Sequence, residues 1–141
     1  MEMVVPISRR LDYVQLKLAI LREYLSEKKY DAVLLQREAN ISWLTSEVLN
    51  EFPYNLLLEK FAFLVTKDQF FLIANNPELL RNIVEDIAGM QLKVVPISVF
   101  GSIEKEVDRI IGSEKVASDT EIGIFQTETL QLEELRFSIL K

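Results

Sequence analysis

Apolar residues recur every three or four positions in the first part of the chain, which predicts an amphipathic helix over about 9–29. The run DAVLLQ at 31–36 is short, mostly apolar and bounded by polar residues, as is typical of a buried strand. The next segment, REANISWLTS at 37–46, has apolar residues on one helical side and predicts a short second helix. The stripe of the first helix consists of Leu11, Val14, Leu18, Leu21 and Leu25.

Two runs rich in Phe, Leu, Val and Ile follow at 61–66 and 69–75, and a pair of polar residues separates them. Such a pattern predicts a β-hairpin. The preceding residues 47–58 show no clean period, and Pro53 among them disfavours helical geometry at the residue before it. We therefore interpret 47–58 as a loop.

The second half of the chain continues with alternating helix and strand patterns. A helix over 76–89 begins with proline at its first position and ends at a glycine. The apolar run at 92–97 is a fourth strand. Ser98 or Ser102 begins the next helix, which ends at Gly112.

A strand at 115–118 and a final helix from about Ile122 to near Phe137 complete the predicted elements. A tight hairpin makes its strands antiparallel neighbours, whereas strand–helix–strand units give right-handed parallel crossovers. The order of elements therefore predicts a three-layer α/β fold. Its mixed five-stranded sheet has the ribonuclease-H-like order 3-2-1-4-5, with helices on both faces. No repeat or low-complexity segment interrupts it, so residues 1–141 are expected to form one domain.

The composition narrows the chemistry that this chain can perform. With 141 residues, 49% of them apolar, it can build one substantial core. It contains neither Cys nor His, which excludes disulfides, thiol nucleophiles, imidazole bases and every Ser-His or Cys-His triad. Its four glycines do not form a phosphate-binding loop or a dinucleotide fingerprint.

The charge balance is acidic, with 22 acidic and 16 basic side chains and a net charge of −6. Such a chain has no overall attraction for a phosphate backbone or an anionic membrane, so we expect neither nucleic acid nor a membrane as a partner. The N-terminus lacks the long apolar stretch of a signal peptide, and a cytoplasmic location is expected.

Several weaker signals favour ordinary structural roles. A two-metal nuclease of this topology needs carboxylates on its first and fourth strands, but Asp31 lies at the start of the first run and 92–97 contains no acid. Ser102 and Lys105 have Ser-x-x-Lys spacing, yet Ser102 fits better as a helix N-cap. The remaining charged helical residues are interpreted as solvated faces: Glu104, Glu106, Asp108, Arg109, Glu133 and Glu134. No catalytic and no metal-binding residue is therefore expected on this chain.

A set of short motifs spread along the chain resembles the N-terminal domain of the creatinase, prolidase and aminopeptidase P family. Arg10 and Leu11 open the first helix, followed by DAVLL at 31–35 and EANISWLT at 38–45. The hairpin FAFLVTKDQFFLIAN and the later EKVASD complete the similarity, which covers nearly the whole chain. The stretch from Asp31 to Thr45 is its most specific part.

This resemblance implies that the chemistry takes place elsewhere. In the family, a larger C-terminal domain of pita-bread fold supplies two Asp, one His and two Glu to a dinuclear divalent metal centre that cleaves bonds next to proline. The N-terminal domain packs across a homodimer interface and helps to wall the substrate pocket. The residues nearest to that role by position are Tyr54, Phe52, Trp43, Asn40 and Asn55.

Structural interpretations compete with the pocket role at several of these positions. Trp43 and Phe52 are large aromatic residues beside leucines, which favours the core, and Asn40 is expected to be a helix N-cap or a turn former. Tyr54 lies beside Pro53 in the loop and is the strongest candidate for a contact. Two functional hypotheses remain: an N-terminal fragment of a metal-dependent Xaa-Pro peptidase, whose partner is its own C-terminal catalytic domain, or a free-standing binding or dimerisation module.

Overall fold

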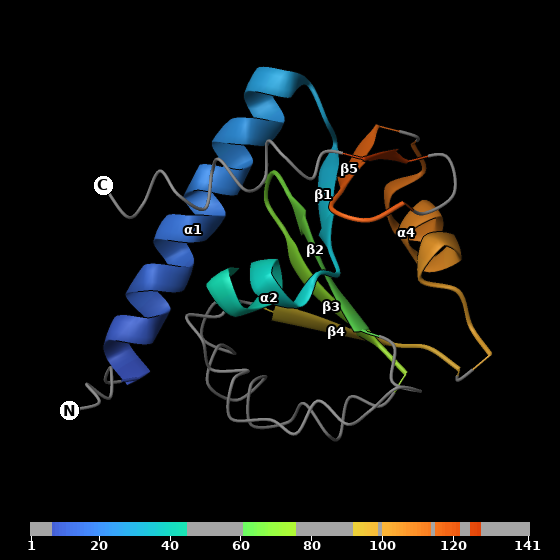
Figure 1. Ribbon diagram of the computed structural model, residues 1–141, viewed down its shortest axis with the longest axis horizontal. Helices are drawn as coiled ribbons and strands as arrows, with labels where there is room; N and C mark the ends of the chain where they lie inside the picture. Colours follow the sequence, from blue (N-terminus) through green and yellow to red (C-terminus); the bar gives the residue numbers. More distant parts are fainter. Residues whose placement is uncertain are drawn as a thin grey trace.

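The computed structural model describes residues 7–44, 61–75, 92–98, 100–113, 115–121 and 125–127. Within them lie three helices and six strands (Figure 1). The helices are α1 (Ile7–Lys28), α2 (Glu38–Leu44) and α4 (Ile103–Ile111). The strands are β1 (Ala32–Leu35), β2 (Phe61–Thr66), β3 (Phe70–Ala74), β4 (Leu92–Pro96), β5 (Val116–Ser118) and β6 (Gln126–Thr127). The predicted helix over 76–89 and the predicted loop over 47–58 lie outside the described residues.

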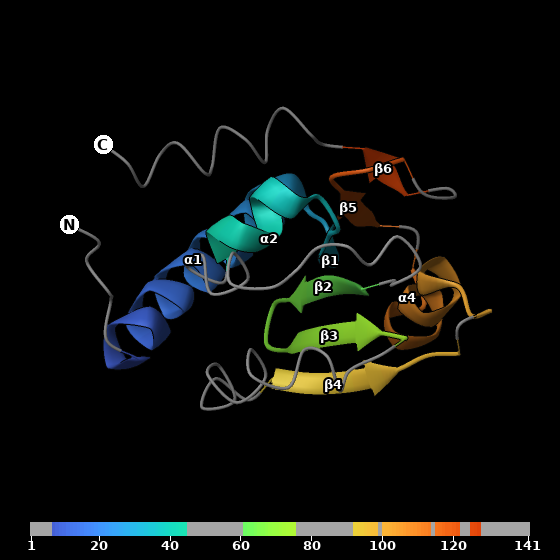
Figure 2. The same cartoon turned by 60° about the horizontal axis from the view of Figure 1, so that its bottom comes forward.

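All described strands belong to one mixed sheet with the order β4-β3-β2-β1-β5-β6. β1, β2 and β3 form an antiparallel meander, in which the hairpin pairs Phe61 with Ala74 and Val65 with Phe70. The pairs β3–β4, β1–β5 and β5–β6 are parallel. Figure 2 shows β2, β3 and β4 side by side at one end of the sheet. The predicted mixed α/β class is therefore confirmed.

The predicted strand order is also present, but different segments fill its last two places. β5 lies beside β1 and β6 follows it, so the series β3-β2-β1-β5-β6 has the ribonuclease-H-like order. The segment predicted as the fourth strand, now β4, instead extends the other end of the sheet beside β3. A strand–helix–strand unit demands parallel strands without specifying the partner, and consecutive strands are usually neighbours. β4 accordingly pairs with the strand that precedes it in the chain.

The prediction of a final helix from about Ile122 is wrong over the described part of that segment, because Gln126 and Thr127 form β6. These two residues pair in parallel with Ala117 and Ser118 of β5. β5 is only three residues long, and an unpaired outer edge would leave its backbone groups without partners. Residues 128–137 of the predicted helix lie outside the described residues.

The sheet separates two apolar layers, as Figure 1 shows with α1 and α2 on one side and α4 on the other. Alternate side chains of a strand point to opposite faces, which distributes the buried residues between the layers. In β1, Val33 and Leu35 contribute to the layer with α1 and α2, whereas Ala32 and Leu34 contribute to the layer with α4. The predicted placement of helices on both faces is confirmed.

α1 also contacts the hairpin through a charged side chain. The guanidinium of Arg22 donates from Nε to the backbone oxygen of Thr66 at 3.0 Å and from a terminal nitrogen to that of Gln69 at 3.4 Å. These carbonyls flank the hairpin turn, whose two central residues have no positive φ. The turn is therefore held by Arg22 and by the Thr66 hydroxyl, which accepts from the backbone N–H of Gln69 at 2.9 Å.

The carboxyl end of α1 has a left-handed residue that is not glycine. Lys29 has φ 62°, and the backbone N–H of the next residue, Tyr30, donates to the oxygen of Leu25 at 3.0 Å. This is the 6→1 bond of a Schellman motif, in which glycine is the usual left-handed residue. The rings of Tyr24 and Tyr30 stack beside it, with centroids 6.1 Å apart. The motif therefore requires a left-handed conformation at position 29, which is sterically unfavourable for a residue with a β-carbon such as Lys29.

We expect the substitution Lys29→Gly to raise the free energy of unfolding by about 0.5–1 kcal/mol, because glycine adopts the left-handed conformation without a steric penalty. The matched control is Lys28→Gly, since Lys28 is the last helical residue of α1 and is also exposed. That control should lower the free energy of unfolding by up to about 1 kcal/mol. Urea unfolding followed by circular dichroism measures both, and equal changes in the two variants would contradict the expectation.

Candidate functional site

A buried carboxylate lies at the end of β5. Asp119 is only 1% exposed, and its two oxygens accept hydrogen bonds from three N–H groups of one distant segment. The backbone N–H of Gln36 lies 2.9 Å from Oδ1 and 3.1 Å from Oδ2. The backbone N–H of Arg37 lies 2.8 Å from Oδ2, and the side-chain amide of Asn40 lies 3.0 Å from the same oxygen.

The sheet register explains why these groups meet. β1 and β5 are parallel, and Leu34 is the partner of Ser118, so the carboxyl ends of both strands lie at one edge. Gln36 and Arg37 come directly after β1, and Asp119 comes directly after β5. The backbone N–H of Asp119 also donates to the oxygen of Leu34 at 3.3 Å. The hydroxyl of Thr120 donates to the side-chain oxygen of Gln36 at 2.9 Å, which adds a second link between the strand ends.

Asn40 lies inside α2, so the prediction that it caps a helix or forms a turn is wrong. The first helical bond runs from the N–H of Ile41 to the oxygen of Arg37, which makes Arg37 the cap residue by position. Asn40 is 3% exposed and donates its amide to Asp119. The amino end of α2 is therefore held by a carboxylate from a distant part of the sequence. A negative charge is favourable at the amino end of a helix.

The other end of α2 is contacted by a basic side chain from α1. The ammonium of Lys17, a residue only 9% exposed, donates to the backbone oxygen of Trp43. Its Nζ also lies 5.6 Å from the centroid of the Trp43 ring. A cation favours the carboxyl end of a helix, where backbone oxygens lack helical partners. α2 is thus flanked by opposite charges, each at the end that suits the helix dipole.

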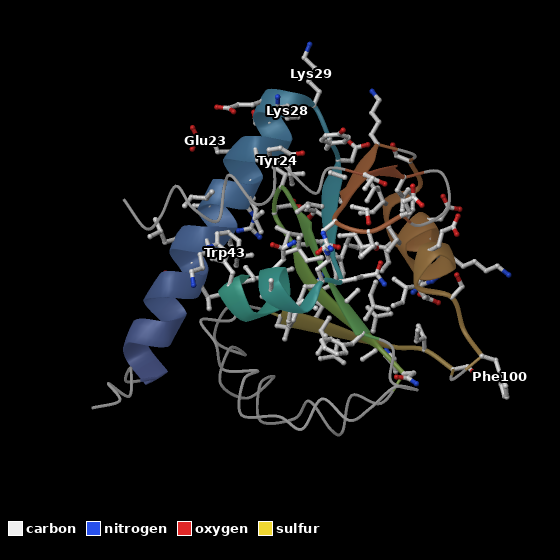
Figure 3. The ribbon with its side chains drawn as sticks, in the orientation of Figure 1. Glu23, Tyr24, Lys28, Lys29, Trp43 and Phe100 are labelled. Atoms are coloured by element: carbon white, nitrogen blue, oxygen red, sulfur yellow. The ribbon has the colours of Figure 1, made fainter. Side chains whose placement is uncertain are left out.

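Trp43 itself lies between α1 and α2 (Figure 3). Its ring is partly buried and packs against the core layer of α1, as the core interpretation predicts. Within the described part of the chain, its indole N–H has no hydrogen-bond partner although the nitrogen is buried. Its role in a substrate pocket stays a prediction.

The other pocket candidates, Phe52, Tyr54 and Asn55, lie outside the described residues. Ser102 is the N-cap of α4, since its hydroxyl accepts from the backbone N–H of Lys105 at 3.3 Å, and this confirms the structural interpretation of the Ser-x-x-Lys spacing. The predicted solvated face of α4 is also present where Arg109 pairs with Glu106 at 2.7 Å. The residues 133 and 134 lie outside the described residues.

The two charged residues beside α2 were missed by the sequence analysis, although each leaves a signal. Asp119 is a polar residue directly after the predicted strand at 115–118, which is its signal in the sequence, but its meeting with the residues after the first strand depends on the pairing of β5 with β1. Lys17 occupies a core-facing position of α1, between the buried Val14 and Leu18. A basic residue in an apolar stripe signals a buried partner.

At this site the Asp119 side chain acts as a hydrogen-bond acceptor for N–H groups. Each oxygen of Asp119 accepts hydrogen bonds from the segment that begins α2. Among residues 7–44, 61–75 and the shorter described ranges, no group of three or more acidic side chains could hold a metal ion. The arrangement therefore supports a structural connection between β5, β1 and α2.

One aromatic side chain lies outside both core layers. Phe100 is 93% exposed and points away from the body of the protein in the turn between β4 and α4 (Figure 3). Next to Phe100, the N–H of Gly101 donates to the oxygen of Ser98 at 2.7 Å. A β-carbon on Gly101 would lie 2.9 Å from that same oxygen, so the turn favours glycine there. Aromatic side chains are enriched in interfaces between proteins.

No helix in the described part of the chain combines the length and apolar character needed to cross a bilayer.

Comparison with solved structures shows the fold of Xaa-Pro dipeptidases. An N-terminal domain of Xaa-Pro dipeptidase from Lactobacillus brevis matches with a TM-score of 0.54 and 19% identity, over 84% of each chain. A proline dipeptidase from Streptococcus pneumoniae matches with a TM-score of 0.60 and 18% identity, over 86% of this chain and 97% of that chain. These matches confirm the fold that the motif resemblance implied.

The Xaa-Pro dipeptidase from Bacillus anthracis is much longer than this chain. It matches with a TM-score of 0.55 and 17% identity over 89% of this chain, which spans only 31% of the Bacillus protein. Scans against protein-family models and curated proteins find no match. The similarity therefore lies in the fold, and it concerns one part of a longer dipeptidase.

We expect Asp119→Ala to lower the free energy of unfolding by about 2–4 kcal/mol, because it leaves two backbone N–H groups and the Asn40 amide without their buried acceptor. Asp31→Ala is the matched control, since Asp31 is exposed at the other end of β1 and should change the value by less than about 0.5 kcal/mol. Urea unfolding followed by the fluorescence of Trp43, the single tryptophan, measures both. A loss below about 1 kcal/mol in Asp119→Ala would contradict this role.

Proposed function

We propose that residues 1–141 form the non-catalytic N-terminal domain of a metal-dependent Xaa-Pro dipeptidase or aminopeptidase. The observation that carries the proposal is the match to an N-terminal domain of Xaa-Pro dipeptidase over 84% of both chains. The motif resemblance supports it independently, because its most specific part, from Asp31 to Thr45, contains β1 and α2. The domain contributes to dimer packing and to the wall of the substrate pocket.

The proposed division of labour follows from the residues that this chain contains. A polypeptide without His cannot supply the imidazole of the dinuclear divalent metal centre that the resemblance implies. In this proposal that centre belongs to a C-terminal catalytic domain of pita-bread fold, which is the first partner of this domain. A cytoplasmic location is part of this proposal.

The pocket wall is assigned to α2 and the residues that follow it. Trp43 lies near the carboxyl end of α2, Asn40 lies near its amino end, and the chain then continues to Phe52, Tyr54 and Asn55. Aromatic and amide side chains provide apolar surface with a few polar groups, which is the usual composition of a small-molecule pocket. In this proposal their role is to bind and orient the substrate, and catalysis belongs to the C-terminal domain.

A free-standing binding or dimerisation module on the same scaffold is the second candidate. The almost fully exposed Phe100 supports it, because aromatic side chains are enriched in contacts between proteins. The two candidates differ in one respect that can be measured: the size of the native polypeptide.

The first test measures the native protein and its activity together. An antibody against this chain should detect a polypeptide well above 16.3 kDa in the source cells. The protein purified with that antibody should hydrolyse an Xaa-Pro dipeptide in the presence of added divalent metal and lose this activity on chelation. The 141-residue chain alone should show no metal-stimulated hydrolysis.

Each outcome of this test has a distinct meaning. A native polypeptide of the size of the chain, without hydrolysis, would establish the binding module and reject the peptidase domain. Hydrolysis by the 141-residue chain that survives repurification would reject the non-catalytic role. A long native polypeptide that does not cleave next to proline would reject the substrate class.

A second test concerns the dimer. We expect Phe100→Ser to weaken self-association of the chain by about tenfold in dissociation constant, because an exposed aromatic anchor loses its contact area. Lys67→Ser, at the exposed hairpin turn, is the control and should leave association unchanged. Sedimentation velocity over a wide concentration range measures both. Equal sedimentation of the parent and Phe100→Ser at every concentration would reject Phe100 as a dimer contact.

A further inference from the structure

β4 forms one edge of the sheet. It pairs with β3 on one side, and in the described part of the chain no further strand lies beyond it (Figure 2). Three of its side chains, those of Lys93, Val94 and Pro96, are exposed, and Val94 is 37% exposed. An exposed edge strand presents backbone N–H and C=O groups that can pair with a strand of another chain. This edge is therefore a candidate interaction surface.

A backbone bond at the end of β4 shows which of its groups face outward. The N–H of Ile97 donates to the oxygen of Ala74 in β3 at 2.9 Å. Successive residues of a strand direct their N–H and C=O groups to opposite sides, so Ile97 and every second residue before it face β3. The groups of the alternate residues face outward: Leu92, Val94 and Pro96. Proline has no N–H, and the outer side of an edge strand is where it is tolerated.

The lysine of β4 does not shield this edge. Lysine on an edge strand commonly discourages pairing with another chain. Here the Nζ of Lys93 lies 5.9 Å from the centroid of the Phe71 ring, and Phe71 is the register partner of Lys93 on β3. The ammonium therefore lies back over the sheet and does not cover the outward backbone groups of β4.

Two copies of β4 can pair with each other in antiparallel orientation about a two-fold axis. With the axis at Val94, the two Val94 residues exchange both of their N–H···O bonds. The N–H of Leu92 then donates to the oxygen of Pro96 in the second copy, whereas Pro96 has no N–H to return. Such pairing covers the β4 edge of both copies and does not propagate, because each copy uses the same strand.

Charge favours this register over the neighbouring ones. An axis at Lys93 would place the two Lys93 side chains directly opposite each other, which is unfavourable. An axis at Val95 would put Pro96, which lacks a donor, opposite Val94. With the axis at Val94, Lys93 lies opposite Val95, and the two exposed Val94 side chains contact each other. Lys93 is the only charged residue in the sequence from 92 to 103, so the segment adds no acidic repulsion to the net charge of −6.

We propose that β4 is a self-association strand: two copies of this chain pair their β4 edges antiparallel about Val94 and so join their two sheets into one. This inference rests on the proposed function for its use, since it names the surface behind the proposed dimer packing. Phe100, whose contribution to the dimer is tested above, follows the same strand in the chain. The pairing itself depends only on the groups of β4.

Sedimentation velocity measures self-association of the 141-residue chain and of variants that change the outward backbone groups. We expect Val94→Pro to weaken association by about tenfold or more in dissociation constant, because it removes the central N–H donor of both copies. Val94→Thr is the matched control, since threonine keeps the N–H and the β-branched shape. It should change the constant by less than about threefold. Circular dichroism checks that each variant is folded.

Pro96→Val tests the same register in the opposite direction. Valine supplies an outward N–H, which in the proposed pairing donates to the oxygen of Leu92 in the second copy. We expect association to tighten by about fivefold or more in dissociation constant. The restored N–H faces away from β3, so the pairing of β4 within the chain is kept. This variant therefore tests the inference even if Val94→Pro does not fold.

Cysteine cross-linking locates the axis. The chain has no native cysteine, so each variant carries a single thiol. Opposite residues of a hydrogen-bonded antiparallel pair have Cα atoms about 5.5 Å apart, a separation that a disulfide can span. Under mild oxidation Val94→Cys should form a disulfide-linked dimer about tenfold faster than Lys93→Cys, its exposed neighbour, or Lys67→Cys at the hairpin turn. Non-reducing electrophoresis measures the rates.

Several results would overturn the inference. A folded Val94→Pro variant with the parent's dissociation constant would show that association does not use this edge. Association that is not tightened in Pro96→Val, or faster cross-linking of Lys93→Cys than of Val94→Cys, would reject the axis at Val94. A dimer that survives Val94→Pro would keep the proposed dimer packing and remove β4 from it. Hydrolysis next to proline is measured on the native protein, so its failure would reject the peptidase role without altering these results.

Discussion

The carboxylate of Asp119 connects parts of the chain that are about 80 positions apart in sequence. Removing a carboxylate from water is costly unless hydrogen bonds replace its hydration, and here the N–H groups at the start of α2 replace it. The hydrogen bonds between Asp119 and the start of α2 can form only when β5 lies parallel to β1, since that register brings the two strand ends together. Formation of α2 is therefore coupled to completion of the sheet.

The elements that the sequence predicts well are those whose boundaries are encoded locally. α4 begins at the Ser102 cap and ends at Gly112 with φ 67°, and both signals are present in the sequence. α2 has its charged partners at Asp119 and Lys17, far from it in the chain, so no local signal shows what holds it. Asn40 illustrates the difference, since its residue type suggests a cap whereas its amide contacts Asp119.

The series of strand positions could be predicted from the sequence, but not which segment occupies each position. A short apolar run identifies a buried strand, and the connections identify parallel pairs, but neither specifies which strand is the neighbour. β4 could join either end of the sheet, and it joins β3. β6 was missed because a two-residue strand is too short to show a period, and its pairing with β5 depends on the completed sheet. The candidate site could be predicted in part, since the motifs that carry the resemblance include Asn40 and Asp119. Their contact could not be predicted, because it depends on the register of β5 against β1.

At 17–19% identity, what this chain shares with the dipeptidase structures is the fold. Many apolar side chains can fill its core layers equally well, so the fold persists while the residues change. A buried carboxylate is less exchangeable, because a substitution leaves its N–H partners without an acceptor. Function depends on particular sites rather than on the fold. The polar contacts at both ends of α2 therefore constrain its position more strictly than the exchangeable apolar contacts of the core do.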